Sequence, residues 1–208
     1  MDNPIQKALA GARALLVFTV LAIAAVALPG CGKYDELVQK DTVAQQRWAD
    51  IEAQLQRRYD LIPNLVNIVK ASAKHEEGTL AAVTAARARA TGITMSADDL
   101  TDPEKVKQFQ AAQDQLSGTL SRLLVVQEAY PDLKANQGFR DLQVQLEGTE
   151  NRVLRSREQY NEAVSDYNAT LAKIGGSVVN KVTGKPFKPR VFFSASAEAQ
   201  GAPKVSFD

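Results

Sequence analysis

The chain of 208 residues contains one cysteine, Cys31, and one histidine, His75. These two residue types supply most zinc ligands and many nucleophile–base pairs, and a single copy of each leaves few arrangements. A zinc site of the usual Cys/His kind needs more ligands, and the charged helical stretch around His75 favours a solvated side chain. The sequence therefore predicts no metal, no cofactor and no catalytic residue, so we expect a protein that is not an enzyme.

Cys31 ends the sequence Leu28-Pro29-Gly30-Cys31, which resembles a bacterial lipobox, the motif whose cysteine is acylated and becomes the new amino terminus. Pro29 departs from that motif. Residues 14–28 form an apolar run of 15 residues after a weakly basic start, the layout of a secretory signal. As a helix the run spans roughly 22 Å, less than the ~30 Å hydrocarbon core, although uncharged sequence continues through Gly32. Lipidation at Cys31 and an uncleaved transmembrane anchor both remain open, and either one tethers the chain to a membrane.

Carboxylates are plentiful, and the densest polar cluster between residues 139 and 174 joins Glu147, Glu150 and Asn151 to Arg152 and Arg155. Spacings of three and four residues let Glu147 share a helical face with Glu150 or Asn151. The spacing predicts a solvated or salt-bridged face, and the alternative is a buried recognition site. Metal sites in helical bundles usually need Glu-x-x-His on facing helices, and that spacing does not occur in this sequence.

The charge balance argues against one class of partner. Removing residues 1–30 with Asp2, Lys7 and Arg13 leaves 23 basic and 23 acidic residues. A general nucleic-acid binder is expected to carry a basic excess. Aromatic residues make up only 6% of the chain, a composition that suits helices better than sheets. We therefore expect a helical protein that does not bind nucleic acid.

Apolar residues recur at helical spacing in four stretches. The pattern predicts helices over about 34–58, 61–90, 103–130 and 139–174. We expect the first break at 59–63, with Asp60 as a cap and Pro63 in the first turn of a new helix. Asp102-Pro103 begins the third helix in the same way, Pro131 ends it, and Asn136 lies in a turn or cap before the fourth. Short connections favour an antiparallel up-and-down four-helix bundle.

The tail after residue 174 mixes basic and aromatic side chains. The bundle topology returns residue 174 to the membrane side, where basic residues among aromatics could bind anionic headgroups. An extended segment docked on the bundle is the favoured alternative. The residues that would contact the membrane surface are Lys181, Lys185, Lys188 and Arg190.

Several long blocks resemble the LemA family of bacterial membrane-anchored proteins. They are residues 54–90, residues 109–153, the sequence YNEAVSDYN at 160–168 and the closing APKVSFD. The resemblance implies a helical bundle behind an amino-terminal membrane anchor. It also implies a scaffolding role, because relatives include a magnetosome membrane-assembly protein. It carries over no catalytic residues, and it does not decide the role of Cys31, since family members include both lipoproteins and signal-anchored proteins.

Together these observations predict an all-α protein in three parts. Residues 1–30 form a signal or anchor segment, 31–174 a LemA-like helical bundle and 175–208 an extended tail. We expect a non-enzymatic scaffold or interaction module with an unidentified protein partner. It would be tethered to a bacterial cell membrane or envelope, with the bulk of the chain outside the cytoplasm. The alternative is a bundle that binds a small molecule or lipid, in which small residues of the second helix line a cavity; these residues are Ala81, Ala82, Ala85 and Ala86.

Overall fold

The computed structural model describes the backbone of residues 4–73, 76–174, 184 and 187–194. Side chains are described for residues 34–73 and 76–173 and in the same later stretches, with Gly32 in addition. The helices are α1 (Pro4–Ser72), α2 (Glu77–Gly92), α3 (Pro103–Val125), α4 (Pro131–Ala135) and α5 (Gln137–Ile174). Two 3₁₀ turns, η1 (Asp99–Thr101) and η2 (Val126–Ala129), flank α3. The described residues include no strand, so the all-α prediction is confirmed.

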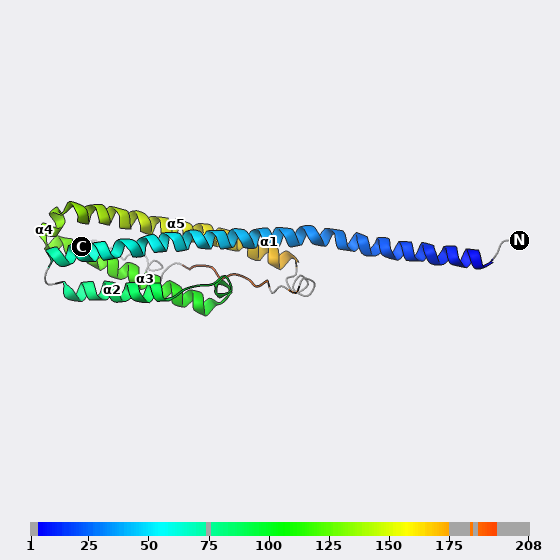
Figure 1. Cartoon of the computed structure of the whole chain (residues 1–208), viewed down its shortest axis with the longest axis horizontal. Helices are drawn as coiled ribbons and strands as arrows, with labels where there is room; N and C mark the ends of the chain where they lie inside the picture. Colours follow the sequence, from blue (N-terminus) through cyan, green and yellow to red (C-terminus); the bar gives the residue numbers. More distant parts are fainter. Residues whose placement is uncertain (1–3, 74–75, 175–183, 185–186, 195–208) are drawn as a thin grey trace, which may run out of the picture.

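The four longer helices alternate in direction along the long axis of the molecule (Figure 1). Helix α1 packs mainly along α5, and α2 packs mainly along α3. Helix α1 also extends beyond the other helices towards the amino terminus (Figure 1). The end of α5 returns to the place where α1 leaves the other helices, because Lys40 Nζ donates to Thr170 Oγ1 at 2.8 Å and Leu37 clusters with Leu171.

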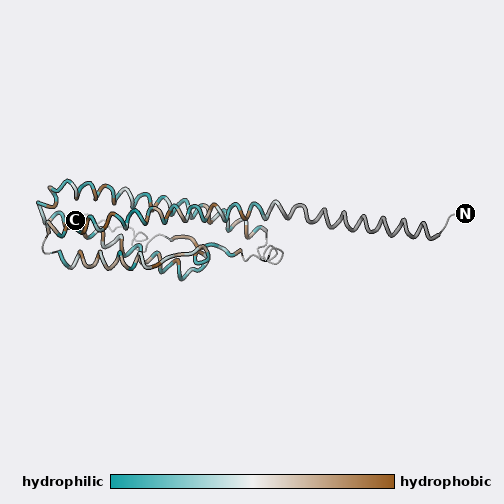
Figure 2. The backbone as a smooth tube through the Cα atoms, in the orientation of Figure 1, coloured by the Kyte–Doolittle hydropathy of each residue, from teal (hydrophilic) through white to brown (hydrophobic). Residues whose placement is uncertain are grey.

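The predicted apolar stripes form the core. Hydrophobic positions recur along all four longer helices (Figure 2). One contiguous cluster draws buried side chains from each of them, which is how amphipathic helices remove their apolar faces from water. Its members at predicted stripe positions include Trp48, Ile51, Leu55, Leu65, Leu80, Val83, Phe109, Leu116, Leu120, Leu123, Leu146, Val153, Tyr160 and Val164.

The predicted break at 59–63 is wrong. Helix α1 runs without interruption through Pro63 to Ser72, and the chain breaks at 73–76 instead. Proline lacks the N–H that would bond to the carbonyl four residues earlier, here that of Tyr59. Arg87 of α2 supplies the missing donor, because its Nε bonds to the Tyr59 carbonyl oxygen at 3.0 Å. Burial of Ile62 and Leu65 on the same helical face favours continuing the helix.

Replacement of Pro63 by alanine should therefore stabilise the protein, and the bond from Arg87 to the Tyr59 carbonyl should then contribute less to stability. We expect Pro63→Ala to raise the free energy of unfolding by about 1–3 kcal/mol, since alanine restores the helical bond. Arg87→Ala should cost about 1–2 kcal/mol in the native background and clearly less beside Pro63→Ala. Urea unfolding followed by circular dichroism of the four variants measures this coupling. Additive effects of the two substitutions would contradict it.

The other predicted helix ends follow their local signals more closely. Asp102 caps α3, because its Oδ1 accepts from the backbone N–H of Glu104 at 3.0 Å. Helix α3 gives way to η2 at Val126, and Pro131 then begins the short α4. Asn136 is a cap, because its Oδ1 accepts from the backbone N–H of Phe139 at 3.1 Å in the first turn of α5.

Candidate functional site

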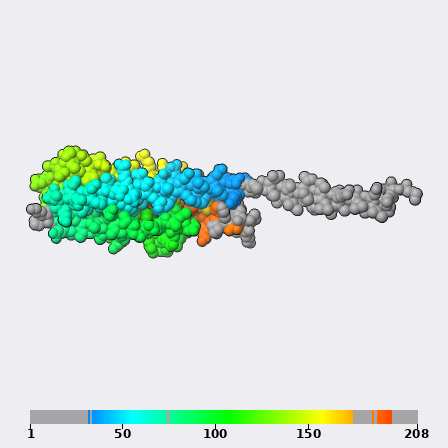
Figure 3. Space-filling model, in the orientation of Figure 1, coloured from blue at the N-terminus to red at the C-terminus, as the bar shows by residue number. Residues whose placement is uncertain are grey.

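Residues 187–194, here called the docked segment, lie extended against the helices. The segment contacts α1, α3, α5 and the chain around η1. Figure 3 shows part of it, in orange, near the place where α1 leaves the other helices. The favoured expectation of an extended segment docked on the bundle is thus confirmed for these residues.

The structure places the four predicted membrane-contact residues differently. Lys188 is exposed, as membrane contact requires. Arg190 is buried and turned towards the helices, so the expectation that its guanidinium faces lipid headgroups is wrong. Asp41 of α1 is the physical reason, because it pairs with the Arg190 guanidinium. We call the surface of α1, α3, α5 and residues 97–100 that the docked segment covers the groove. Lys181 and Lys185 lie outside the described residues.

Two asparagines of α5 hold the main chain of the docked segment. The Asn168 amide accepts from the Arg190 N–H and donates to the Arg190 carbonyl, each at 2.9 Å. The Asn161 amide does the same for Phe193, at 2.9 Å and 2.8 Å respectively. Each side chain thus satisfies one donor and one acceptor that an isolated extended strand would leave unpaired. We call Asn161 and Asn168 the asparagine clamp.

The spacing of the clamp matches the spacing of an extended chain. Seven residues of helix separate the two asparagines and rise about 10.5 Å, while three residues of extended chain separate their targets and rise about 10 Å. The preceding tyrosines follow the same rule. Tyr160 Oη donates to the Val191 carbonyl at 3.4 Å, and Tyr167 Oη donates to the Lys188 carbonyl at 3.0 Å. The docked segment therefore runs antiparallel to α5.

Phe193 fills an aromatic cage in the middle of the core. Its ring stacks on Trp48 with the centroids 5.9 Å apart, and it meets Tyr160 edge-on at 5.4 Å and Phe109 at 6.3 Å. The Arg157 guanidinium lies 5.2 Å from the ring centroid, within range of a cation–π interaction. A side chain in such a cage is a large apolar contribution to holding the segment.

Arg190 provides the charged counterpart of Phe193. Its Nε and one terminal nitrogen both contact Asp41 Oδ1, at 2.9 Å and 2.8 Å, and the other terminal nitrogen donates to the Ala97 carbonyl at 3.2 Å. The guanidinium is buried, and its charge is therefore paired in a partly desolvated place. The docked segment is recognised through its backbone and through these two side chains.

Tyr160 and Tyr167 should make the free energy of unfolding fall at alkaline pH. Burial raises the pKa of Tyr160 and that of Tyr167 to about 12, above the ordinary value near 10. The folded state binds these protons more tightly than the unfolded chain, so their contribution to stability is complete below about pH 10 and is lost as the pH rises towards 12. We expect the free energy of unfolding to decline over this window. The pH dependence of urea unfolding measures the decline, and a Tyr160→Phe, Tyr167→Phe variant should show a shallower one. Equal slopes in the two proteins would contradict this assignment.

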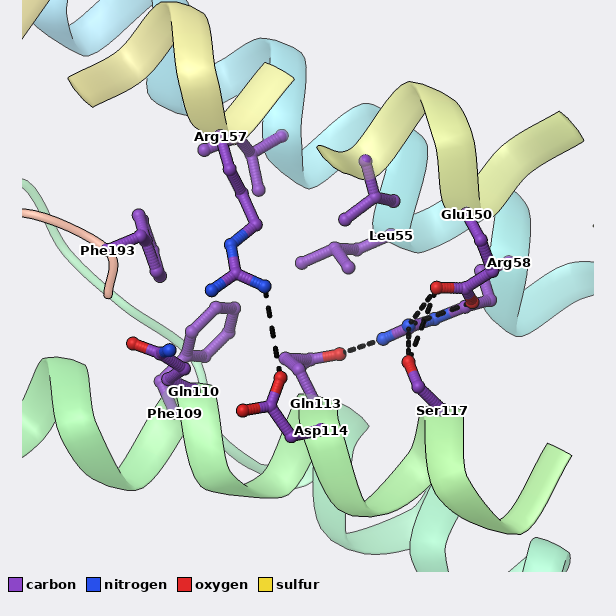
Figure 4. A pocket seen from close by; sticks show the side chains of 12 residues that line it. Leu55, Arg58, Phe109, Gln110, Gln113, Asp114, Ser117, Glu150, Arg157 and Phe193 are labelled. Carbon is purple, nitrogen blue, oxygen red and sulfur yellow. Dashed lines mark hydrogen bonds and ion pairs between the residues drawn. The ribbon is translucent and has the colours of Figure 1, made fainter. Parts of the chain in front are cut away.

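A polar cleft lies beside Phe193, between α1, α3 and α5 (Figure 4). Arg58 of α1 is 1% exposed and donates to both carboxylate oxygens of Glu150, at 3.0 Å and 3.2 Å. It also bonds to Ser117 Oγ at 2.9 Å and to Gln113 Oε1. Gln113 in turn donates to Tyr59 Oη at 2.7 Å. Arg58 is thus bound to α3 and α5 at once.

This network shows which of the two alternatives holds for Glu147, Glu150 and Asn151. Glu150 belongs to a salt bridge, as predicted, but its partner Arg58 comes from another helix. Glu147 and Asn151 are exposed. Arg58 was not among the predicted functional residues, although the sequence contains a signal for it: the residue lies on the stripe of buried residues, three positions after Leu55.

The charged side chains that line the cleft balance one another. Arg157 lies 3.8 Å from Asp114, so the cleft holds two arginines and two carboxylates. Its volume is about 40 Å³, room for one or two water molecules. Among the side chains that the structure describes, no three His, Cys, Asp or Glu residues converge on a position where a metal ion could bind.

The four alanines of α2 named above line neither of the two clefts described here. Ala81, Ala82 and Ala85 are exposed, and Ala86 is packed in the core. A second cleft of about 190 Å³ lies between α1 and the carboxyl end of α2, lined by residues such as Tyr59. Both clefts are smaller than the 300–1,000 Å³ typical of small-molecule sites. The alternative of a ligand held behind these alanines gains no support.

The predicted anchor lies in the first part of α1. Residues 4–31 continue that helix by their backbone, and the side chains of the apolar run 14–28 and of Cys31 lie outside the described residues. Among the residues whose side chains the structure describes, no helix combines the length and the hydropathy that crossing a bilayer requires.

Comparison with known proteins places the chain in a family. Two curated relatives, "Magnetosome protein MamQ 1" and "Magnetosome protein MamQ 2" of Paramagnetospirillum magneticum (strain ATCC 700264 / AMB-1), are each 26% identical to it over 196 residues. Each alignment covers 86% of this chain and 71% of the relative. The sequence pattern of the LemA family matches residues 47–207, which include α2 to α5, most of the buried residues of α1 and the docked segment. This chain therefore belongs to the LemA family.

Proposed function

We propose that the protein is a membrane-tethered, non-enzymatic interaction module: an antiparallel four-helix bundle carried by an amino-terminal anchor. The observation that carries the proposal is the groove described above. Side-chain amides in it bind the backbone of an extended segment, and an aromatic cage and Asp41 bind two of its side chains. Amides that pair with peptide groups, joined to pockets for chosen side chains, are the means by which proteins recognise extended peptides.

The buried charges support a binding role over a catalytic one. Arg58 and Arg190 each lie against a carboxylate, so the described buried charges serve to hold helices and segment together. A catalytic site usually brings a nucleophile near a base whose pKa is shifted towards neutrality. In the groove, burial raises the pKa of Tyr160 and that of Tyr167 to about 12, which is further from neutrality.

The tether rests on the amino-terminal sequence and on the relatives. The apolar run at 14–28 and Cys31 favour an anchor, and two relatives are named as magnetosome proteins. The basic residues that precede the run favour an orientation with the bundle outside the cytoplasm. In this arrangement the helices present an exposed surface to a protein partner near the membrane. Val144 and Leu154 of α5 are apolar and exposed on that surface.

Crosslinking in intact cells tests the interaction role. A photo-crosslinking side chain at position 144 or 154 is expected to recover a reproducible protein partner, while the same probe without irradiation recovers none. Exposed apolar side chains of this kind are a usual part of protein interfaces. If neither position yields a reproducible product, the proposed function is wrong.

The mass of the intact protein isolated from membranes tests the form of the tether. An acylated protein should begin at Cys31 and carry the added mass of its acyl chains, and Cys31→Ser should abolish both changes. An unmodified, full-length mass would remove the lipoprotein form and leave the uncleaved anchor.

A further inference from the structure

The docked segment is bound in the manner of a peptide ligand. Its main-chain groups at positions 188, 190, 191, 193 and 194 bond to side chains of α3 and α5, namely Tyr167, Asn168, Tyr160, Asn161, Gln110 and Arg157. One backbone bond to the helical part adds to these, from Val191 N–H to the Leu100 carbonyl at 2.9 Å. Such contacts fix an extended conformation and a register without depending on side-chain identity.

The two most deeply buried side chains of the segment supply most of its sequence selectivity. Arg190 and Phe193 are buried at 6% and 7% exposure, Phe187 and Val191 are partly buried against the helices, and Lys188, Pro189, Phe192 and Ser194 are exposed. The distance between the two buried side chains is fixed by the clamp, because Asn168 and Asn161 hold the same two residues by their backbones. The groove therefore selects an extended peptide with the pattern Arg-x-x-Phe.

The connection between α5 and the docked segment is longer than the intramolecular arrangement needs. Tyr167, which bonds to Lys188, lies seven positions before the end of α5, about 10.5 Å along the helix. Residues 175–186 join the two, and twelve residues can span roughly 40 Å when extended. Each helix with its side chains is about 10–12 Å wide, so a body two helices across is about 20–24 Å wide, and this reach includes the groove of a neighbouring copy lying alongside.

We infer that the groove is a peptide-binding site for Arg-x-x-Phe segments and that residues 187–194 of a second copy occupy it in exchange for the chain's own segment. The contacts made between copies are the same as those made within one copy. The balance between them therefore depends on the effective concentration of the linked segment against the local concentration of neighbours. The inference rests on the proposed function, because tethering to one membrane would raise that local concentration, and it names the partner as the same protein.

Complementation between two full-length variants tests the exchange. The groove variant carries Asn161→Ala and Asn168→Ala and keeps its segment. The segment variant carries Arg190→Ala and Phe193→Ala and keeps its groove. Neither can complete the site alone, but a mixture offers one intact groove and one intact segment. We compare how much untagged segment variant is retained by two tagged proteins. The tagged groove variant should retain at least about 10-fold more of it than the tagged segment variant does, because only the first pair contains both an intact groove and an intact segment.

The matched control is a groove variant that also carries Phe193→Ala, which removes the Arg-x-x-Phe pattern and should abolish retention. Retention in the mixture that does not exceed either control, with helical circular dichroism preserved in both variants, would overturn the inference.

If a variant loses its helical signal, a pair of single-cysteine chains with the groove contacts largely intact replaces it. One full-length chain carries Gln110→Cys and the other Ser194→Cys, each with Cys31→Ser. These two side chains are in contact across the groove, with Ser194 Oγ 3.3 Å from Gln110 Oε1. Mild oxidation of the mixture should give a covalent dimer of the two chains well above the yield of a control pair, Val144→Cys with Ser194→Cys. A yield equal to that of the control would overturn the inference.

The outcomes separate the inference from the proposed function. Reproducible crosslinks to a different protein in cells, together with no exchange in either experiment, would overturn self-exchange and leave the interaction module standing. Exchange without any crosslinked partner from positions 144 and 154 would support self-exchange and remove the broader proposal of a helix surface bound by another protein.

Discussion

Phe193→Ala is expected to lower the free energy of unfolding by about 3–5 kcal/mol, the usual cost of truncating a buried phenylalanine. The ring is 7% exposed and lies among Trp48, Phe109 and Tyr160. Its removal leaves a cavity in the core and detaches the docked segment, so the bonds of Asn161 to the segment backbone are weakened as well. The change therefore affects both packing and hydrogen bonding.

Phe192→Ala is the matched control, because the same substitution one residue earlier removes a side chain that is 47% exposed. We expect it to cost less than about 1 kcal/mol. Urea unfolding followed by circular dichroism measures both values. Trypsin cleavage after Arg190 offers a second measurement, since this buried site should become accessible only in the Phe193 variant. Equal losses of stability in the two variants would show that the cage does not hold the segment.

Glu150→Gln is expected to lower the free energy of unfolding by about 2–4 kcal/mol. Removing one partner of a buried ion pair typically costs 3–5 kcal/mol, and we expect somewhat less because the Glu150 side chain is 35% exposed and partly hydrated. The Arg58 guanidinium is 1% exposed and would keep its charge without a carboxylate to balance it. Glu147→Gln, one turn earlier on the exposed face of α5, should stay within about 0.5 kcal/mol.

Replacement of both Arg58 and Glu150 distinguishes the cost of an unpaired buried charge from the cost of lost packing. Arg58→Met with Glu150→Met removes both charges and keeps much of the apolar volume, so it should cost less than Glu150→Gln alone. Urea unfolding of Arg58→Met, of Glu150→Met and of the double variant measures the coupling between the two residues. A double variant that is less stable than either single variant would mean that Arg58 acts mainly through its bonds to Ser117 and Gln113.

The sequence was sufficient for much of the fold because its signals are local. Stripes of apolar residues at helical spacing identified most of the core, and Asp102-Pro103 marked the start of α3 correctly. The error at Pro63 has a different origin. Proline is a local signal for a helix start, but the carbonyl that it leaves free is bonded by Arg87, a residue 28 positions from Tyr59 on another helix. A local signal cannot report a partner at that distance.

The candidate site shows the same division. The repeat of Tyr-Asn at 160 and 167 is visible in the sequence, and its seven-residue spacing places both tyrosines on one helical face, where both are buried. The role of Asn161 and Asn168 is not visible, because an asparagine beside a helical stripe looks the same whether it faces water or a peptide backbone. Its partners are the backbone groups of Phe193 and Arg190, 32 and 22 residues later.

By itself the sequence determined the all-α class, the buried faces of the helices and membership of a family with a recognisable pattern. Hydrophobic periodicity and capping act between residues a few positions apart, so a linear pattern contains them. Only the tertiary structure decided which charges are buried and what fills the groove. A polar side chain is stable in a core only when a partner meets it, and packing of distant helices brings Arg58 to Glu150 and Arg190 to Asp41.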